Sequence, residues 1–362
     1  MHIIQLIDSD KSGAILRYSD ELKKSTNVYY NEFSIENYYF KTEDPNNRLL
    51  ISESSFFILE SADYLFIHSL PNKNSNNIYS KIINNIQTKK VLFIHYHNVK
   101  ELYANVNINF FRQLLFNCHI IFVYSFDKLI KEELLKILGE ELYNKVVKDM
   151  HIIYNFDSKP NFDNLNYKSN SILFVDHSHN TLCDKYISIY KNYKDKLDNV
   201  YEYSIYGVVK NVQTMNINDL YINTKTNETS KITNFDDNID INKLNIRKNL
   251  DYDKFIYKVQ KSKLVYDFSP NLTYTILDSI NNGTVVVTNK QMLKSYSINS
   301  KQSLYDINMI PNDEISYNQL NMIVNNTTIY KDALLKTYNM LKSVLNAKNE
   351  INNIYKNIGI IY

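Results

Sequence analysis

The segment 264–288 constrains the fold more than any other part of the chain. It reads LVYDFSPNLTYTILDSINNGTVVVT. The β-branched and aromatic run at each end predicts a strand, and the stretch between them predicts a Ser-Pro corner and a short helix that ends near Gly283. Two strands joined by a helix form a βαβ unit of a parallel sheet.

The start of that helix could bind a nucleotide. The first N–H groups of a helix have no intrahelical partner, and the positive end of the dipole favours an anion such as pyrophosphate. Asp278 lies about one turn further along and could accept hydrogen bonds from the hydroxyls of a ribose. The alternative is an ordinary βαβ unit that binds no ligand.

Length and composition place the chain among globular proteins with two domains. A length of 362 residues is sufficient for two domains, and the hydrophobic (44%) and charged (22%) fractions are near the averages of globular proteins. Only five glycines occur, so each is expected at a backbone position that other residues cannot adopt. With a net charge of +2, a nucleic-acid partner would require a local basic patch.

Cysteine usage and hydropathy favour a cytoplasmic protein. Cys118 and Cys183 are the two cysteines, and no C-x-x-C or Cys/His zinc spacing is present, which argues for a reducing compartment and against a structural metal. The chain shows no basic-then-apolar leader and no segment near the ~20 apolar residues of a membrane span. Secretion and membrane insertion are therefore not expected.

Short apolar runs alternate with helical stretches, which is typical of a doubly wound α/β protein. In the first half, strands are expected at 2–7, 28–33, 64–69, 91–96, 119–125 and 151–154, and helices at 16–24, 52–61, 76–88, 108–118 and 128–148. In the second half, strands are expected at 171–175 and 200–206, and helices at 184–194, 252–262, 317–325 and 330–355. Residues 211–249 are polar and show no clear period.

The polar segment around Pro160 predicts a linker between two Rossmann-like domains. We place a first domain at 1–158 and a second, nucleotide-binding domain at 165–344, with the terminal helix 345–362 packing back onto the first domain. Two such domains would face each other across a cleft, with ligands at the carboxyl ends of the strands.

Several side chains fall where α/β proteins place reactive groups. His95 and His97 follow an apolar strand, and His177 follows the first strand of the second half. Histidine can hydrogen-bond a sugar or phosphate and exchange protons near neutral pH. Gly13, between the first strand and helix, could allow a close backbone approach. Each of these could instead be a structural residue of a turn.

Six segments carry a resemblance to a known family. In chain order they are 64–71 (YLFIHSLP), 95–99 (HYHNV), 119–127, 154–156 (YNF), 201–207 (YEYSIYG) and 274–278 (YTILD) with the following Gly283-Thr284. Together they resemble GT-B glycosyltransferases, and more narrowly the phage DNA α-glucosyltransferases of T-even type, which transfer glucose from UDP-glucose to hydroxymethylcytosine in DNA. The resemblance spans nearly the whole length.

The chain departs from that family at three places. Tyr96 stands where the family has Asp between the two histidines, and Asp278 stands for the Glu that binds ribose. The Arg and Lys that hold the donor pyrophosphate in the family fall near His177 and Lys185. Because of these departures, a protein that keeps the fold but has no transferase activity is an alternative.

The resemblance implies a retaining, metal-independent hexosyltransferase that uses a UDP-sugar as co-substrate and no other cofactor. Donor binding would fall to a set of seven residues: Gly13, Asn155, His177, Lys185, Tyr274, Thr275 and Asp278. His95 and His97 would orient the sugar or the acceptor hydroxyl, and the leaving phosphate would take the acceptor's proton. The implied partner is double-stranded DNA with modified bases, in the host cytoplasm. A surface or capsular saccharide as acceptor, or a binding protein without activity, are the alternatives.

Overall fold

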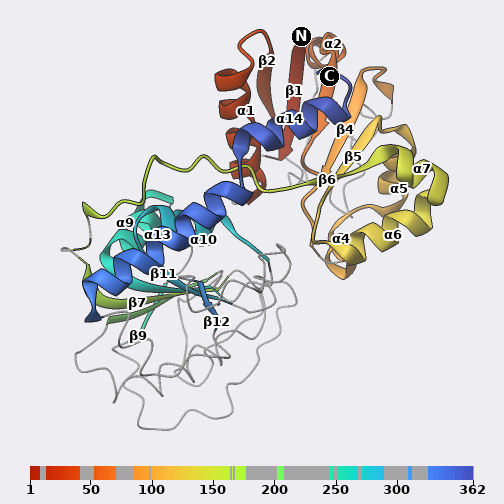
Figure 1. Ribbon diagram of the computed structural model, residues 1–362. Coiled ribbons are helices and arrows are strands. Elements are labelled where there is room, and N and C mark those ends of the chain that lie inside the picture. The colour runs from red at the N-terminus through yellow and green to blue at the C-terminus, as the bar shows by residue number, and fades with distance from the viewer. Residues whose placement is uncertain are drawn as a thin grey trace. The chain divides into compact units, whose positions relative to one another are not determined.

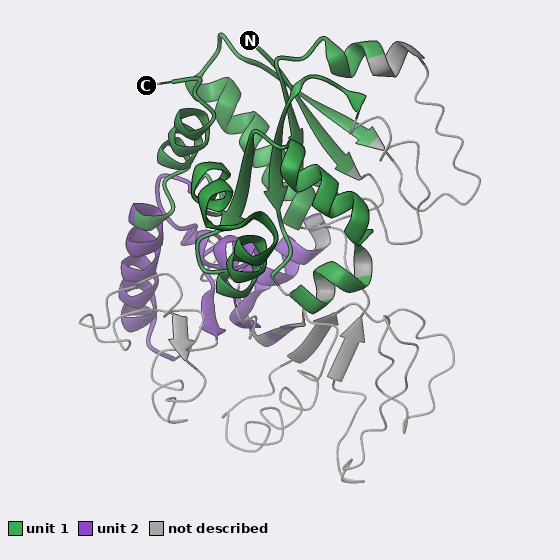
Figure 2. Ribbon diagram, turned by 90° about the vertical axis from the view of Figure 1, so that its right-hand side faces the viewer, with its two compact units in different colours: residues 1–155, 344–362 green, residues 156–343 purple. Residues whose placement is uncertain are grey.

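The computed structural model describes residues 1–8, 14–40, 53–70, 85–97, 99–163, 165, 168–176, 202–207, 244–247, 252–267, 271–288, 309–311 and 325–361. It divides into two compact units (Figure 2). Unit 1 comprises Met1–Asn155 and Val344–Tyr362, and unit 2 comprises Phe156–Ser343. The bounds expected from the sequence, 1–158 with 345–362 and 165–344, differ from these by one to nine residues.

Unit 1 is built on a parallel sheet of six strands in the order β2-β1-β3-β4-β5-β6 (Figure 1). The strands are β1 (His2–Asp8), β2 (Ser34–Phe40), β3 (Tyr64–Ile67), β4 (Lys89–Ile94), β5 (Ile120–Tyr124) and β6 (Val147–Met150). The helices are α1 (Ala14–Tyr29), α2 (Glu53–Glu60), α4 (Val99–Asn105), α5 (Ile108–Asn117), α6 (Lys128–Leu138), α7 (Glu140–Val146) and α14 (Ala347–Asn357). The strand order reverses between β1 and β3, and ligands of such sheets bind outside the carboxyl ends of the strands at this point.

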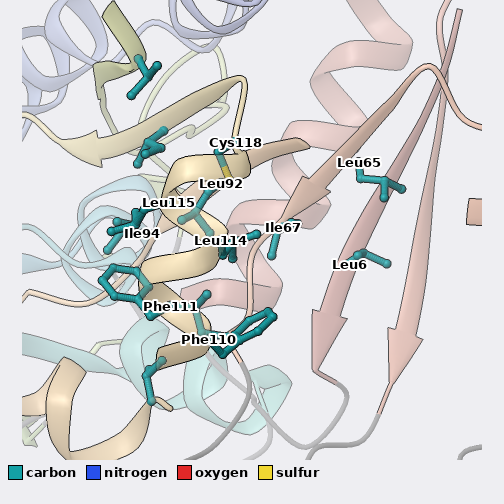
Figure 3. Packing of buried hydrophobic residues seen from close by; sticks show 14 of the residues in the cluster. Leu6, Leu65, Ile67, Leu92, Ile94, Phe110, Phe111, Leu114, Leu115 and Cys118 are labelled. Atoms are coloured by element: carbon teal, nitrogen blue, oxygen red, sulfur yellow. The ribbon is translucent and has the colours of Figure 1, made fainter. Parts of the chain in front are cut away.

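The two faces of the sheet in unit 1 carry different side chains because alternate residues of a strand point to opposite faces. On one face, aliphatic residues pack on α5 and α6, and Figure 3 shows part of this cluster: Leu6, Leu65, Ile67, Leu92, Ile94, Phe110, Phe111, Leu114 and Leu115. On the other face, Phe93 lies between Phe66 and Phe122, with Tyr18 of α1 against it (ring centroids 5.9 Å apart). Helices therefore cover both faces.

Unit 2 has a second six-stranded parallel sheet, in the order β12-β11-β10-β7-β8-β9. Its elements are β7 (Ser169–Asp176), β8 (Glu202–Gly207), β9 (Leu244–Arg247), α9 (Tyr252–Lys261), β10 (Ser262–Asp267), α10 (Tyr274–Asn281), β11 (Val285–Thr288), β12 (Met309–Pro311) and α13 (Thr327–Val344). Numbered from β7, the order is 3-2-1-4-5-6, which is that of the Rossmann fold, and it reverses between β7 and β10. The predicted βαβ unit is confirmed as β10-α10-β11, with Leu264 opposite Val285.

The turn between α10 and β11 needs glycine. Gly283 has φ +74°, and a Cβ built there would lie 2.2 Å from the backbone oxygen of Asn161. The linker is held at this turn by Asn281, whose side-chain nitrogen donates to Asp157 (2.9 Å). Gly283 precedes β11, so it lies at the amino edge of the sheet, away from the carboxyl edge where ligands of such sheets bind.

Four expected elements differ from the structure. The expected strand 151–154 is wrong, because the strand at this place, β6, is Val147–Met150. The expected strand 28–33 is wrong, because α1 continues to Tyr29 and the strand is Ser34–Phe40. Thr26 bonds Tyr355 of α14 (Oγ1 to OH 2.6 Å), a contact that no local pattern shows. The expected helix 128–148 is broken at Gly139 (φ +74°), after which Val147–Met150 pairs with β5. The terminal helix 330–355 is two helices, because the Asn346 side chain caps a new one by accepting from the N–H of Asn349 (3.1 Å).

The second of these helices, α14, belongs to unit 1. Glu350 accepts from the backbone N–H of His151 (2.9 Å) and contacts its Nδ1 (3.1 Å), and Tyr64 donates to the carbonyl of Ile358 (3.1 Å). None of the helices in the described ranges is long and apolar enough to cross a membrane.

Candidate functional site

The carboxyl edge of the sheet in unit 2 holds the start of α10. Asp267, the last residue of β10, is fully buried and accepts a hydrogen bond from the Thr273 hydroxyl (2.8 Å). The same Thr273 oxygen accepts from the N–H of Ile276 (3.2 Å), so it is the N-cap of α10. The strand end and the helix start are thus fixed to each other beside the point where the strand order reverses.

The residues expected to bind the donor lie in the first turns of this helix. Tyr274 and Thr275 occupy its first two positions, where N–H groups fall outside the intrahelical ladder. Asp278 lies one turn further along and is 3% exposed. The donor-binding role of these three residues stays a prediction.

A buried hydroxyl without a partner lies at the same edge. Thr288 ends β11 opposite Asp267 of β10 and is fully buried. Its Oγ1 has no hydrogen-bond partner among the residues that the structure describes. Such groups are uncommon, because an unpaired buried hydroxyl costs roughly 1–3 kcal/mol.

The carboxyl edge of unit 1 carries a chain of hydrogen bonds that crosses β1, β3, β4 and β5. Gln5 Oε1 contacts His68 Nε2 (2.8 Å), His68 Nδ1 contacts His95 Nε2 (3.1 Å), and His95 Nδ1 contacts the Tyr124 hydroxyl (3.1 Å). Gln5, His68 and Tyr124 are buried, with exposures of 0%, 2% and 3%. His95 is therefore tied into the interior through both ring nitrogens.

The donor and the acceptor of each hydrogen bond in this series can be assigned from the groups at its two ends, Gln5 and Tyr124. Gln5 Nε2 donates to the carbonyl of Ser19 (3.0 Å) and to Asn37 (2.7 Å), so Gln5 Oε1 must accept from His68 Nε2–H. Burial lowers the pKa of His68 to about 3, so the ring is neutral and its Nδ1 accepts from His95 Nε2–H.

At the other end of this series of hydrogen bonds, burial raises the pKa of Tyr124, and the nearby Asp127 and Glu350 carboxylates raise it further. The hydroxyl therefore keeps its proton, and because Nε2 of His95 carries the proton donated to His68, the hydroxyl donates to Nδ1 whenever the His95 ring is in its neutral form. Both nitrogens of His95 are occupied by buried protein groups.

His97 is held differently, by a carboxylate from the next loop. Its Nδ1 lies 2.9 Å from Oδ2 of Asp127, which is 6% exposed, whereas the His97 side chain is 39% exposed. The rings of Tyr124 and Phe126 lie 5.1 and 5.6 Å from its ring. Because β4 and β5 are parallel neighbours, the loops that follow them bring His97 and Asp127 together.

Solved structures with this architecture bind UDP. An alpha-glucosyltransferase (AGT) in complex with UDP matches with a TM-score of 0.74 and 14% identity, covering 99% of each chain. An alpha-glucosyltransferase in complex with UDP-glucose and DNA containing an abasic site matches with a TM-score of 0.71 and 14% identity, covering 99% of this chain and 98% of that one. The chain has the GT-B fold. Anabaena HepE in complex with UDP-glucose also matches, with a TM-score of 0.63 and 10% identity over the full length of both chains.

Comparison of the sequence with protein-family models found no match, and comparison with curated proteins found none either. Identities of 10–14% establish the GT-B architecture, whereas the reaction depends on the chemistry of particular residues.

The remaining expected GT-B donor residues fall in two groups. Gly13, His177 and Lys185 lie outside the described residues. Asn155 lies at the end of unit 1, where its side-chain nitrogen donates to Glu21 (2.8 Å) and Ser25 (2.9 Å) of α1. Its role in donor binding stays a prediction. Within the described part of the chain, no group of three His, Cys, Asp or Glu side chains could hold a metal ion.

Sequence reasoning missed four residues of this GT-B chain: Gln5, His68, Asp127 and Asp267. Gln5 is a polar residue inside an apolar strand, which could have signalled a buried contact. Asp127 precedes a helix and reads as an ordinary N-cap, so only the pairing of β4 with β5 reveals its contact with His97.

Proposed function

We propose that the chain is a retaining glucosyltransferase that moves glucose from UDP-glucose to the hydroxymethyl group of a modified pyrimidine in phage DNA. The observation that carries this proposal is its similarity, over nearly the whole of both chains, to alpha-glucosyltransferase structures that hold UDP, UDP-glucose and DNA. The site of action would be the cytoplasm of the host cell.

Donor binding is assigned to unit 2. Its Rossmann strand order, and the start of α10 beside the order reversal, support a diphosphate at the first turn of this helix. Asp278 is assigned to the ribose hydroxyls, and His177 and Lys185 to the pyrophosphate charge. Hydrogen-bond donors there would stabilise the negative charge that develops on the leaving diphosphate.

The acceptor is assigned to unit 1, at the carboxyl edge with His95 and His97. A modified base inside a duplex must leave the stack before it can react, which costs a few kcal/mol. The second candidate acceptor is a saccharide or polyol, and it is favoured by the likeness to S. aureus TarM in complex with α-GlcNAc-glycerol and UDP (TM-score 0.53, 13% identity).

The test is incubation of the full chain with a panel of nucleotide sugars, with plain or hydroxymethylated double-stranded DNA, or with glycerol glycosides. Mass spectrometry of the nucleosides and saccharides detects transfer. We expect a hexose on the hydroxymethylated base alone. A hexose on the glycoside alone would replace the acceptor, and no consumption of any donor would favour a binding protein without activity.

Ionic strength separates the two acceptors further. Affinity for DNA that comes from phosphate contacts falls steeply as salt rises, by roughly a factor of ten or more between 50 and 200 mM for several contacts. Affinity for an uncharged glycoside should stay nearly constant over the same range. A transfer reaction whose KM for DNA does not rise with salt would contradict the assigned acceptor.

A further inference from the structure

We infer that the imidazole of His97 takes the proton of the acceptor hydroxyl, and that Asp127 is its positioning residue. The inference rests on the proposed function and assigns the proton transfer within it. Nδ1 of His97 contacts Asp127, and its other ring nitrogen, Nε2, has no partner among the residues that the structure describes. A half-exposed imidazole anchored through one nitrogen presents the other to a substrate.

The carboxylate of Asp127 is available for this task because it does not cap its own helix. Asp127 occupies the N-cap position of α6 and makes no side-chain capping bond. The nearby ammonium of Lys131 contacts Asp149 (2.5 Å) and the carbonyl of Ser125 (2.9 Å) instead.

An ionised carboxylate at Nδ1 sets the tautomer of His97. The carboxylate can only accept, so the proton of neutral His97 lies on Nδ1 and the lone pair lies on Nε2. A nitrogen with a lone pair can accept a hydroxyl proton, and the carboxylate stabilises the imidazolium that forms, as in the Asp-His pairs of hydrolases.

His95 cannot take this role without breaking the buried chain. Its Nε2 donates to His68 and its Nδ1 accepts from Tyr124. Freeing either nitrogen would leave a buried polar group unpaired, at roughly 1–3 kcal/mol. His95 therefore supports the loop that carries His97.

The proton transfer balances as follows. The acceptor oxygen forms a bond to the anomeric carbon of glucose, and the bond from that carbon to the diphosphate breaks with its electron pair on the diphosphate. The hydroxyl proton passes to His97 Nε2 and then to solvent. In this proposal His97 takes the proton that the resemblance assigns to the leaving phosphate.

The test uses two variants, His97→Gln and Asp127→Asn, with two controls. His119→Gln changes an exposed histidine at the amino edge of the same sheet, and Asp332→Asn changes an exposed aspartate of α13. The asparagine amide can donate to Nδ1 and move the proton of His97 to Nε2. We expect kcat for transfer, and for hydrolysis of UDP-glucose, to fall 10²–10⁴-fold in both variants. KM for UDP-glucose and the Kd of UDP should not change, and the controls should match the wild type.

A second measurement does not depend on the acceptor. ¹⁵N NMR of the histidine rings, with His97 assigned from the His97→Gln spectrum, should show the proton on Nδ1 in the wild type and on Nε2 in Asp127→Asn. A proton on Nε2 in the wild type overturns the inference, even if a variant fails to fold.

The kinetic outcomes separate the inference from the proposed function. Variants that keep wild-type kcat overturn the role of His97 and leave the glucosyltransferase proposal standing. A wild type that neither binds UDP nor consumes UDP-glucose overturns both.

Discussion

Lys168 gives a prediction whose size follows from the structure. Lys168 is 9% exposed, and its ammonium donates to the carbonyls of Gln260 (3.2 Å) and Ser262 (3.1 Å) and to the Thr284 hydroxyl (2.6 Å). These three acceptors are neutral, and burial lowers the pKa of Lys168 from 10.5 to about 7. The folded chain therefore binds this proton more weakly than the unfolded chain does.

The sign of the pH dependence follows from this difference. Between about pH 7 and pH 10.5 the unfolded state carries the proton and the folded state releases it, so the free energy of unfolding rises with pH. The fall of the pKa from 10.5 to about 7 corresponds to about 5 kcal/mol over the whole range, at 1.36 kcal/mol per pH unit. Between pH 7.5 and 9.5 the expected gain is about 2 kcal/mol.

The assay is urea unfolding at pH 7.5 and 9.5, followed by circular dichroism, for the wild type, Lys168→Met and Lys331→Met. Lys331→Met changes an exposed lysine of α13 and should keep the wild-type slope, whereas Lys168→Met should lose about 2 kcal/mol of the pH-dependent gain. Equal slopes in the wild type and Lys168→Met would refute the reasoning. If the free energy of opening measured by hydrogen exchange of the β10 amides rises with pH by the same amount, the effect is located in unit 2.

Three further predictions concern the turn, the α14 contact and the donor. Gly283→Ala should lower the free energy of unfolding in urea by about 2 kcal/mol or more, because the new Cβ would meet the backbone of Asn161. The control Gly139→Ala has the same φ but nothing within 4 Å of its Cβ, and it should cost about 1–2 kcal/mol. Equal losses in the two variants would contradict the close approach of Asn161. The hydrogen bond that His151 donates to the Glu350 carboxylate raises the pKa of His151, so this contact should stabilise unit 1 below about pH 6.5 and be lost as the pH rises. Glu350→Gln should flatten the dependence of thermal stability on pH between pH 5.5 and 8, and an unchanged profile would contradict this role of the contact. Asp278→Asn should weaken UDP-glucose binding about 10–100-fold in calorimetry, because hydrogen bonds to a charged group contribute about 1.5–3 kcal/mol, and an unchanged Kd would remove Asp278 from the donor site.

The architecture could be predicted where the local pattern and the tertiary structure agree. The segment 264–288 contains two apolar strands and one capped helix, and it folds as β10-α10-β11. Much of the order of strands and helices also follows from the alternation of the pattern. The break of the terminal helix was missed, because the Asn346 cap is a single residue within a continuous helical period.

The chemistry at the carboxyl edges was only partly predictable. His95 and His97 look equivalent in the sequence, since both follow the same strand. Their difference arises from residues on other strands: His68 and Tyr124 occupy the nitrogens of His95, and Asp127, 30 residues away, anchors His97. Such contacts depend on which strands are neighbours in the sheet, which the local sequence does not encode.

The most direct test of the account is a crystal structure of the chain with UDP-glucose at saturating concentration. We predict that the diphosphate oxygens accept hydrogen bonds from the first-turn N–H groups of α10, beside Tyr274 and Thr275, with the ribose against Asp278. A nucleotide bound away from α10, or no bound nucleotide at saturation, would contradict the claim that unit 2 holds a sugar donor.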